Sequence, residues 1–425
     1  MTGQTVGVDQ DTAQRMDAAD ELSRFRQEFL ISDPHLIYMD GNSLGRLPRR
    51  TAQRLEQVIN REWGGHLIRG WEGGWYDAPE RIGAKVAELI GAGSDEVIIG
   101  DGTSLNLFKL LMAALQARPD RRRIVSDELN FPTDLYVLQG AVELLGDDHE
   151  IVLAPSRDGV AVDEQFLLDA IDEETALVTL SHPTFKSAYL YDVATITERA
   201  HEMGALVVWD FSHAVGVVPL TLNEWTCDLA VGCTYKFLNG GPGSPAFLYV
   251  RQDLQTELLS PIWGWWGHES PFSFQLAYTP TQHLRRFLAG TPPTLSLLAI
   301  EPGVELLLEA GIDKVRQKSV LLTTYLIELA EAVLVPLGFQ VGSPRNPERR
   351  GSHVSLRHAE GYRITRALKE QMNVIPDFRE PDNIRLGVAP LYTSFVEVWE
   401  AVDRIRRVLV DEVYLEYAQE RQTIT

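Results

Sequence analysis

Strand-like and helix-like stretches alternate along residues 79–250 of this 425-residue chain. Short apolar runs predict buried strands, and apolar residues spaced three or four positions apart predict the helices between them. This alternation is typical of a mostly parallel sheet that helices cover on both faces. The sequence therefore predicts an α/β fold, with strands at residues 96–99, 124–125, 151–153, 176–180 and 205–209, near residue 233 and at residues 246–250.

Polar residues follow several of these strands, at the edge of a parallel sheet where ligands bind. Asp210 ends the run at residues 205–209, and Lys236 follows the strand near residue 233 and precedes a glycine-rich turn at residues 240–243. A desolvated amine in such a place can form a Schiff base with pyridoxal phosphate, whose ring nitrogen a carboxylate can hold. From spacing alone, a surface lysine and a turn aspartate remain the alternative interpretation.

Other residues at this edge are candidates for contacts with such a cofactor. Thr103 and Ser104 stand between a strand and a helix, where unpaired N–H groups suit a phosphate, although a plain helix cap explains them as well. Phe131 and Asp134 could contact a flat ring, but Pro132 beside them also fits an ordinary helix start. His213 could stack on the ring, orient Asp210 or simply pack in the core.

The pattern changes after about residue 247. Residues 261–295 are rich in Trp, Pro and Gly and predict an irregular segment, in which a tryptophan cluster fits a binding wall better than core packing. Strands predicted at residues 354–356 and 384–386 belong to a smaller α+β domain. Arg385 on the second of these strands could bind a carboxylate through two hydrogen bonds, or form a surface ion pair. The expected division is an N-terminal segment at 1–60 associated with the small domain, a large domain at 61–300 and the small domain at 301–425.

Charge and composition exclude several classes of protein. A net charge of −21 argues against binding to nucleic acid or to anionic lipid. Cys227 and Cys233 lack the spacing of a zinc site or a disulfide framework, which fits a reducing compartment. The polar N-terminus predicts no secretory signal. The most apolar stretch, residues 320–339, is interrupted by Glu328 and Glu331, so we expect a cytoplasmic protein with no metal and no membrane span.

The chain resembles the kynureninase family, which comprises pyridoxal-phosphate hydrolases of the aspartate-aminotransferase-like fold (fold type I). The resemblance covers about residues 38–398, and its lysine and tryptophan segments are the specific ones, since generic members of the fold share only the aspartate and the lysine. The segments that carry it are DGNSLG at 40–45, FPTD at 131–134, WDFSHAVG at 209–216, TYKFLNGGPG at 234–243, GWWGH at 264–268 and PLYT at 390–393.

The resemblance implies a role for each candidate around the lysine. Lys236 would carry the cofactor and then act as the catalytic base, and Tyr235 would move a proton as the second catalytic group. The implied cofactor contacts are Thr103, Ser104 and Tyr235 at the phosphate, Phe131 on the ring face, Asp134 at its edge, Ser181 at its oxygen, Asp210 at its nitrogen and His213 beside it.

It also implies a homodimer with shared active sites. Trp265 and Thr291 would complete the phosphate site from the partner subunit. Arg385 would bind the substrate α-carboxylate. The residues implied near the aromatic end of the substrate are Ser43, His66 and Trp71.

The implied reaction is hydrolysis of the Cβ–Cγ bond of L-kynurenine, or of its 3-hydroxy form, to anthranilate, or 3-hydroxyanthranilate, and L-alanine. This is a step of tryptophan degradation and NAD biosynthesis. Three positions depart from the family pattern, because Thr184 replaces a more usual Asn, Ala188 a more usual Gly and Trp266 a more usual Phe.

Alternative functions come from the same fold and from another class. A cysteine desulfurase needs a mobile nucleophilic cysteine near the second domain, whereas Cys227 and Cys233 lie beside the lysine strand. A small-substrate aminotransferase would release a keto acid and leave an aminated cofactor. A non-catalytic regulator that binds the cofactor lacks support, because no DNA-binding segment is appended and the net charge is negative.

Overall fold

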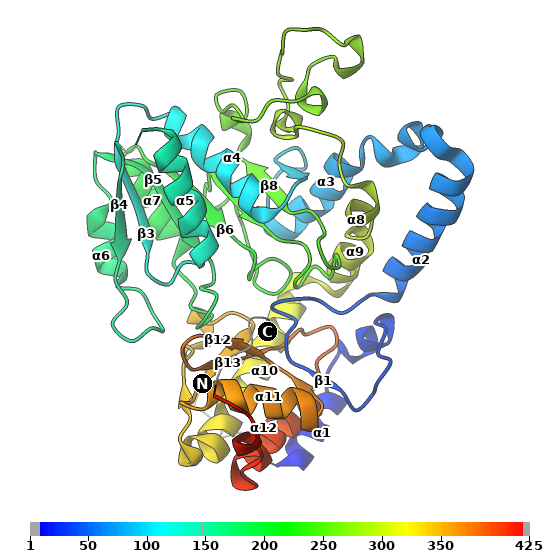
Figure 1. Ribbon diagram of the computed structural model, residues 1–425, viewed down its shortest axis with the longest axis vertical. Helices are drawn as coiled ribbons and strands as arrows, with labels where there is room; N and C mark the ends of the chain where they lie inside the picture. The colour runs from blue at the N-terminus through cyan, green and yellow to red at the C-terminus, as the bar shows by residue number, and fades with distance from the viewer. Residues whose placement is uncertain (1–8, 147, 420–425) are drawn as a thin grey trace.

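The large sheet has seven strands in the order β2-β8-β7-β6-β5-β3-β4 (Figure 1). In this computed structural model, which describes residues 9–146 and 148–419, β8 alone in the sheet runs antiparallel to its neighbours. The predicted, mostly parallel sheet is therefore confirmed. Its strands are β2 (Val97–Ile99), β3 (Arg123–Asp127), β4 (Glu150–Ala154), β5 (Thr175–Ser181), β6 (Leu206–Asp210), β7 (Leu229–Gly232) and β8 (Phe247–Val250).

Helices cover both faces of this sheet, which explains its uninterrupted apolar strands. Every residue of β5, β6 and β7 is buried, as expected for parallel strands covered on two sides. Val207 and Trp209 pack on one face, while Leu206 and Val208 pack on the other. The first face meets α3 (Ala78–Ile90), α6 (Glu164–Ala170), α7 (Val193–Glu202) and α9 (Glu301–Ala310), and the second meets α4 (Thr103–Gln116) and α5 (Pro132–Leu144).

A second hydrophobic cluster forms around a smaller antiparallel sheet of order β12-β13-β10-β9, in the lower half of Figure 1. Ala13, Ile37 and Met39 from the N-terminal part of the chain belong to this cluster. Its elements are α1 (Gln10–Ala18), β1 (Ile37–Tyr38), α10 (Ile312–Leu329), β9 (Gln340–Val341), β10 (His353–Arg357), α11 (Gly361–Gln371), β11 (Val374–Ile375), β12 (Asp377–Arg379), β13 (Asn383–Gly387) and α12 (Phe395–Val410). The predicted domain boundaries at 60 and 300 remain predictions.

The segment predicted to be irregular contains only short helical turns. These are Trp265–Gly267, Pro271–Ser273 and Leu284–Phe287, followed by α8 (Thr294–Leu298). Near the N-terminus, α2 (Arg49–Gln57) continues through the turns Val58–His66, Leu67–Gly70 and Trp71–Trp75.

One helical stretch of the described chain, Ile312–Leu337, is long and apolar enough to cross a membrane. Leu322, Leu326 and Leu329 of this stretch are at most 1% exposed and belong to the second hydrophobic cluster. The stretch is therefore best explained as the core helix of that cluster.

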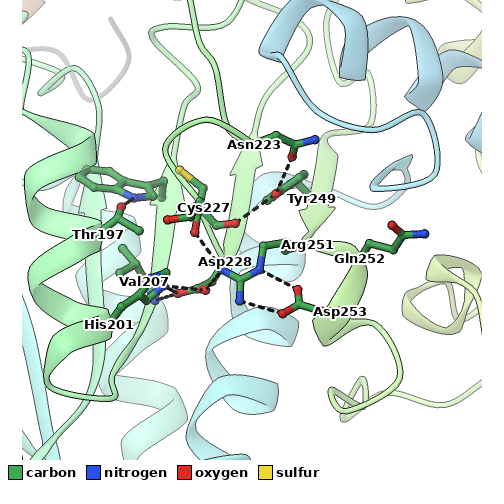
Figure 2. Close-up of polar contacts among 12 residues, drawn as sticks. Thr197, His201, Val207, Asn223, Cys227, Asp228, Tyr249, Arg251, Gln252 and Asp253 are labelled. Atoms are coloured by element: carbon green, nitrogen blue, oxygen red, sulfur yellow. Dashed lines mark hydrogen bonds and ion pairs between the residues drawn. The ribbon is translucent and has the colours of Figure 1, made fainter.

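A buried ionic network, which we call the Asp228 network, lies at the start of β7 (Figure 2). Asp228 is fully buried, and its carboxylate accepts hydrogen bonds from His201 Nε2 at 2.9 Å, Arg251 Nη1 at 2.7 Å and the Val207 N–H at 2.9 Å. Arg251 also pairs with Asp253 at 2.6 Å. These contacts tie α7, β6, β7 and the segment after β8 together, at the end of the strands away from Lys236.

Candidate active site

A pocket of about 350 Å³ lies at the carboxyl ends of the parallel strands, beside the start of α4. It brings together most of the site residues predicted from the sequence, from both the large sheet and the small one. The predicted residues that line it are Ser43, Thr103, Ser104, Phe131, Asp134, Ser181, Asp210, His213, Tyr235, Lys236 and Arg385. Asn42, Thr133, Pro183, Ser212 and Arg379 complete the lining.

Lys236 contacts a neutral histidine in this pocket. Its Nζ lies 2.9 Å from His213 Nε2. Burial, together with the charges of Lys236 and Arg385, lowers the pKa of His213 well below its usual value. His213 is therefore an uncharged imidazole at neutral pH, able to accept a hydrogen bond from the lysine through Nε2. Its Nδ1 is buried and has no hydrogen-bond partner.

Two carboxyl groups meet at the end of β6. Asp134, in the first turn of α5, lies beside Asp210 and accepts a hydrogen bond from Ser181 Oγ at 3.1 Å. Burial and the adjacent Asp210 raise the pKa of Asp134 well above its usual range. Asp210 also accepts a hydrogen bond from the Ser212 N–H at 2.7 Å. Two buried acids this close need a proton or a cation between them, and a protonated ring nitrogen would meet that need at Asp210.

The start of α4 offers unpaired donors. The helix begins at Thr103, and its N-cap, Gly102, supplies no side-chain capping bond. Thr103 Oγ1 is buried without a partner, beside first-turn N–H groups that lack intrahelical acceptors. Unpaired N–H groups, a free hydroxyl and the positive end of the helix dipole are what a phosphate requires. With Asp210, Phe131 and Lys236 in the same pocket, these groups fit pyridoxal phosphate.

Arg385 reaches the pocket from the small sheet and is only 1% exposed. Its Nη1 donates to the Phe185 carbonyl at 2.5 Å and its Nη2 to Ser43 Oγ at 3.2 Å, while Nε has no partner. Nη2 also pairs with Asp377, which Arg379 contacts at 3.0 Å. A carboxylate that binds Arg385 would therefore compete with Asp377.

Sequence reasoning missed several residues at this site. Arg379 lines the pocket, Asp377 holds both arginines, and Asn130 accepts a hydrogen bond from Ser181 Oγ at 2.6 Å. One usable signal existed for Asp377, because it lies directly opposite Arg385 in the pairing of β12 with β13. Residues so close in sequence on neighbouring strands are expected to face each other.

Four predicted residues do not line the pocket of the single chain. Trp265 lines a separate cavity of about 340 Å³, and Thr291 is exposed. His66 is also exposed, and the ring of Trp71 packs 5.4 Å from that of Trp266. The predicted supply of Trp265 and Thr291 from a partner subunit remains a prediction. The predicted roles of His66 and Trp71 in binding the aromatic end of the substrate find no support within one chain and remain predictions.

The loop that departs from the family pattern has a local explanation. Thr184 Oγ1 bonds Ser187 Oγ at 2.7 Å and accepts from the Tyr189 N–H at 3.0 Å, so the substituted threonine holds the loop together. Ala188 has a φ of 64°, in the left-handed region that favours the more usual glycine. Backbone of this kind costs an alanine roughly 1 kcal/mol.

Comparisons with known proteins agree with this geometry. The family model described as "Kynureninase C-terminal domain" matches residues 315–405. Kynureninase of Burkholderia mallei is 43% identical over 95% of this chain and 96% of its own, and kynureninase of Pseudomonas fluorescens is 42% identical over 93% and 94%. A solved structure of a C-DES mutant, with glycine linked to its pyridoxal-phosphate cofactor, shares the fold with a TM-score of 0.78 at 16% identity, over 90% of this chain and 98% of that one. The chain belongs to the kynureninase family, whose members are pyridoxal-phosphate enzymes.

Proposed function

We propose that this chain hydrolyses the Cβ–Cγ bond of L-kynurenine, or of its 3-hydroxy form, to release L-alanine and anthranilate or 3-hydroxyanthranilate. The observation that carries the proposal is the 2.9 Å contact between Lys236 Nζ and neutral His213, in a pocket that Arg385 also lines. An amine beside a proton acceptor, with a carboxylate-binding cation in reach, suits chemistry at the α-carbon of an amino acid.

The residues around Lys236 divide the binding of the cofactor between them. Thr103 and Ser104 hold the phosphate through N–H groups and hydroxyls, Phe131 covers the ring and Asp210 pairs with the ring nitrogen. Bound pyridoxal phosphate supplies an electron sink for the charge that develops at the substrate α-carbon. Asp210 strengthens this sink because a buried carboxylate keeps the ring nitrogen protonated.

Lys236 Nζ would hold the cofactor, and its free amine would be the base that takes the α-proton of the substrate. His213 Nε2 at 2.9 Å keeps this amine in position and, being uncharged, can accept a hydrogen bond from it. A positioned base of this kind typically contributes a factor of about 10²–10⁴ in rate.

Tyr235 is the proposed proton donor to the alanine fragment. Burial and the neighbouring Cys233 raise the pKa of the Tyr235 phenol above its usual value. The phenol therefore keeps its proton at neutral pH and can donate it. Arg385 orients the substrate by binding its α-carboxylate in place of Asp377.

In a homodimer, the partner subunit would supply the phosphate contacts predicted for Trp265 and Thr291. Large apolar side chains are exposed in the predicted shared segment and in the turns that follow α2, and exposed apolar surface favours an interaction between subunits. They are Trp63, Ile68, Trp263, Trp265, Phe272, Phe274 and Leu276. A mass of two chains in size-exclusion chromatography with light scattering supports the dimer, and a monomer that turns over kynurenine at full rate contradicts the shared site. We place the enzyme in the cytoplasm, as expected from its cysteines and charge.

The rival desulfurase reaction lacks its nucleophile in the described chain. Burial, aided by Asp228, raises the pKa of the Cys227 thiol to about 12, and burial also raises that of Cys233. Both thiols are buried, so neither supplies a reactive thiolate.

The test is to incubate purified holoenzyme with L-kynurenine and to quantify the products by chromatography. We expect anthranilate and alanine in equal amounts. A keto acid with an aminated cofactor would instead indicate the aminotransferase, and no turnover of either kynurenine or 3-hydroxykynurenine would refute the proposal.

A further inference from the structure

A second cavity, of about 600 Å³, lies where the two hydrophobic clusters of the chain meet. The large-sheet side supplies its wall from His182, the segment 190–194, Val218, Pro219 and Trp225. Arg316 and Val320 of α10, with residues 347–349, form the opposite wall. None of these residues lines the candidate active site, so the two cavities are separate sites.

Arg316 brings an uncompensated positive charge to this cavity. Its Nη2 donates to the carbonyls of Pro347 at 2.6 Å and Arg350 at 2.9 Å, while its Nη1 is buried without a partner. Within residues 9–146 and 148–419, no carboxylate forms an ion pair with it. Arg349 in the same wall is already paired with Glu164 at 2.9 Å. A half-buried guanidinium with a free N–H group needs an anionic or carbonyl acceptor.

His182 adds a directed donor. The side chain is 4% exposed, and its Nδ1 accepts a hydrogen bond from the Tyr191 N–H at 3.2 Å. Burial and the charges of Arg316 and Arg349 lower the pKa of His182 to about 3, so the ring is neutral. With Nδ1 accepting, the proton resides on Nε2, which forms no hydrogen bond within residues 9–146 and 148–419 and belongs to a ring that lines the cavity.

The rest of the wall is largely apolar, apart from Asp192, whose carboxylate accepts from the Thr195 N–H at the start of α7, and Glu348, which is exposed. Leu190, Val193, Val218, Pro219 and Val320 line it together with the ring of Trp225. One unpaired cation and one N–H donor in an apolar wall match a ligand with a single carboxylate and an apolar body, rather than a phosphate with several charges. We propose that this cavity is a second binding site, for a small aromatic or branched carboxylate.

Occupation of this site would act on the junction between the two sheets. The Leu190 N–H donates to the Arg349 carbonyl at 3.0 Å, and the Gly351 N–H to that of Ala188 at 2.8 Å. The same loop carries Phe185, whose carbonyl accepts from Arg385 in the active site. A carboxylate held between Arg316 and His182 thus stabilises the junction that positions Arg385.

Benzoate is a suitable probe, and calorimetric titration of the Arg385→Gln holoenzyme removes carboxylate binding at the active site. We expect benzoate to bind this variant and to raise its unfolding temperature. Adding Arg316→Gln should weaken the binding about tenfold or more, because a charge-assisted hydrogen bond is lost. In otherwise unchanged enzyme, Arg316→Gln should leave basal turnover within about twofold, because Arg316 is outside the active site.

A second variant keeps the proposal testable if the Arg316→Gln protein does not fold. Val320→Phe fills the cavity, leaves Arg316 in place and should also abolish benzoate binding. Lys314→Gln, on the same helix but outside the cavity and 60% exposed, is the matched control and should bind benzoate normally. The absence of benzoate binding to the Arg385→Gln enzyme would overturn the proposal. So would unchanged affinity in Arg316→Gln or Val320→Phe, or equal weakening by Lys314→Gln.

Discussion

The hydrogen bonding of buried polar groups differs between the two ends of the parallel strands. At the start of β7, both carboxylate oxygens of Asp228 accept hydrogen bonds (Figure 2). At the other end, Thr103 Oγ1, His213 Nδ1 and Arg385 Nε are buried around Lys236 without partners among the described residues. Because an unpaired buried polar group costs free energy, its persistence marks a place where a ligand completes the bonding. The Asp228 network is expected to serve stability, and the pocket around Lys236 to serve chemistry.

The largest expected effect comes from Lys236→Ala, which removes the attachment point and the base together. Turnover of kynurenine should fall at least about a thousandfold. The unfolding midpoint of the cofactor-free protein should change little, since the described contact of Lys236 Nζ is a single one, to His213. Lys314→Ala, at an exposed lysine, is the control for activity and stability. Turnover of Lys236→Ala within tenfold of the unchanged enzyme would contradict the assignment of the pocket around Lys236 to chemistry.

Asp228→Ala should produce the converse result. Leaving buried donors without their acceptor typically costs about 1–3 kcal/mol, and here His201 and the Val207 N–H lose Asp228 while Arg251 keeps Asp253. Denaturant unfolding should show this loss, while kcat per folded molecule stays the same. A variant with normal stability and impaired kcat would place the Asp228 network in the catalytic machinery and contradict the distinction drawn here.

Arg385→Gln tests the role of one buried positive charge inside the active site. The loss of a buried charge that binds the substrate carboxylate should lower kcat/KM about a hundredfold, mostly through KM. Steady-state kinetics measure it, with Arg357→Gln as control, because Arg357 lies in the same small sheet but pairs with Asp382 outside the pocket. An unchanged KM would show that Arg385 pairs with Asp377 and does not bind the substrate carboxylate.

A smaller effect separates Asp228 from another fully buried acid, Asp127, with which no cation of the described chain forms an ion pair. Burial raises the pKa of Asp127 to about 7. Between pH 4 and 7 the folded chain keeps a proton that the unfolded chain loses, so the unfolding free energy falls as pH rises. Asp127→Asn removes this contribution and should lose about 1–2 kcal/mol less than the unchanged protein between pH 6 and 8. Urea unfolding at the two pH values measures the difference, and equal losses would contradict the assigned cause.

Much of the sheet was predictable because its strands are short apolar runs that polar residues or glycines separate. Buried strands such as Thr175–Ser181 and Leu206–Asp210 leave a clear signal, since helices cover both faces. The ends of such strands converge at one edge. The meeting of Asp210 and Lys236 therefore followed from strand order once each was recognised as the residue after a strand.

The remainder of the site depends on contacts between distant parts of the chain. Arg385 donates to the carbonyl of Phe185, 200 positions earlier, and Ser181 bonds Asn130 across 51 positions. Periodicity and local spacing carry no information about such pairs. Nor does the sequence around His182 indicate a ring that faces a second cavity, because that wall forms only when α10 packs against the large sheet.

The attachment of the cofactor to Lys236 is the central claim and can be measured directly. Borohydride reduction of the purified holoenzyme, followed by proteolysis and mass spectrometry, locates the lysine that carries pyridoxal phosphate. We predict the adduct on the peptide that contains Lys236, and its loss when the cofactor is stripped before reduction. An adduct on another lysine, with Lys236 unmodified, would contradict the account.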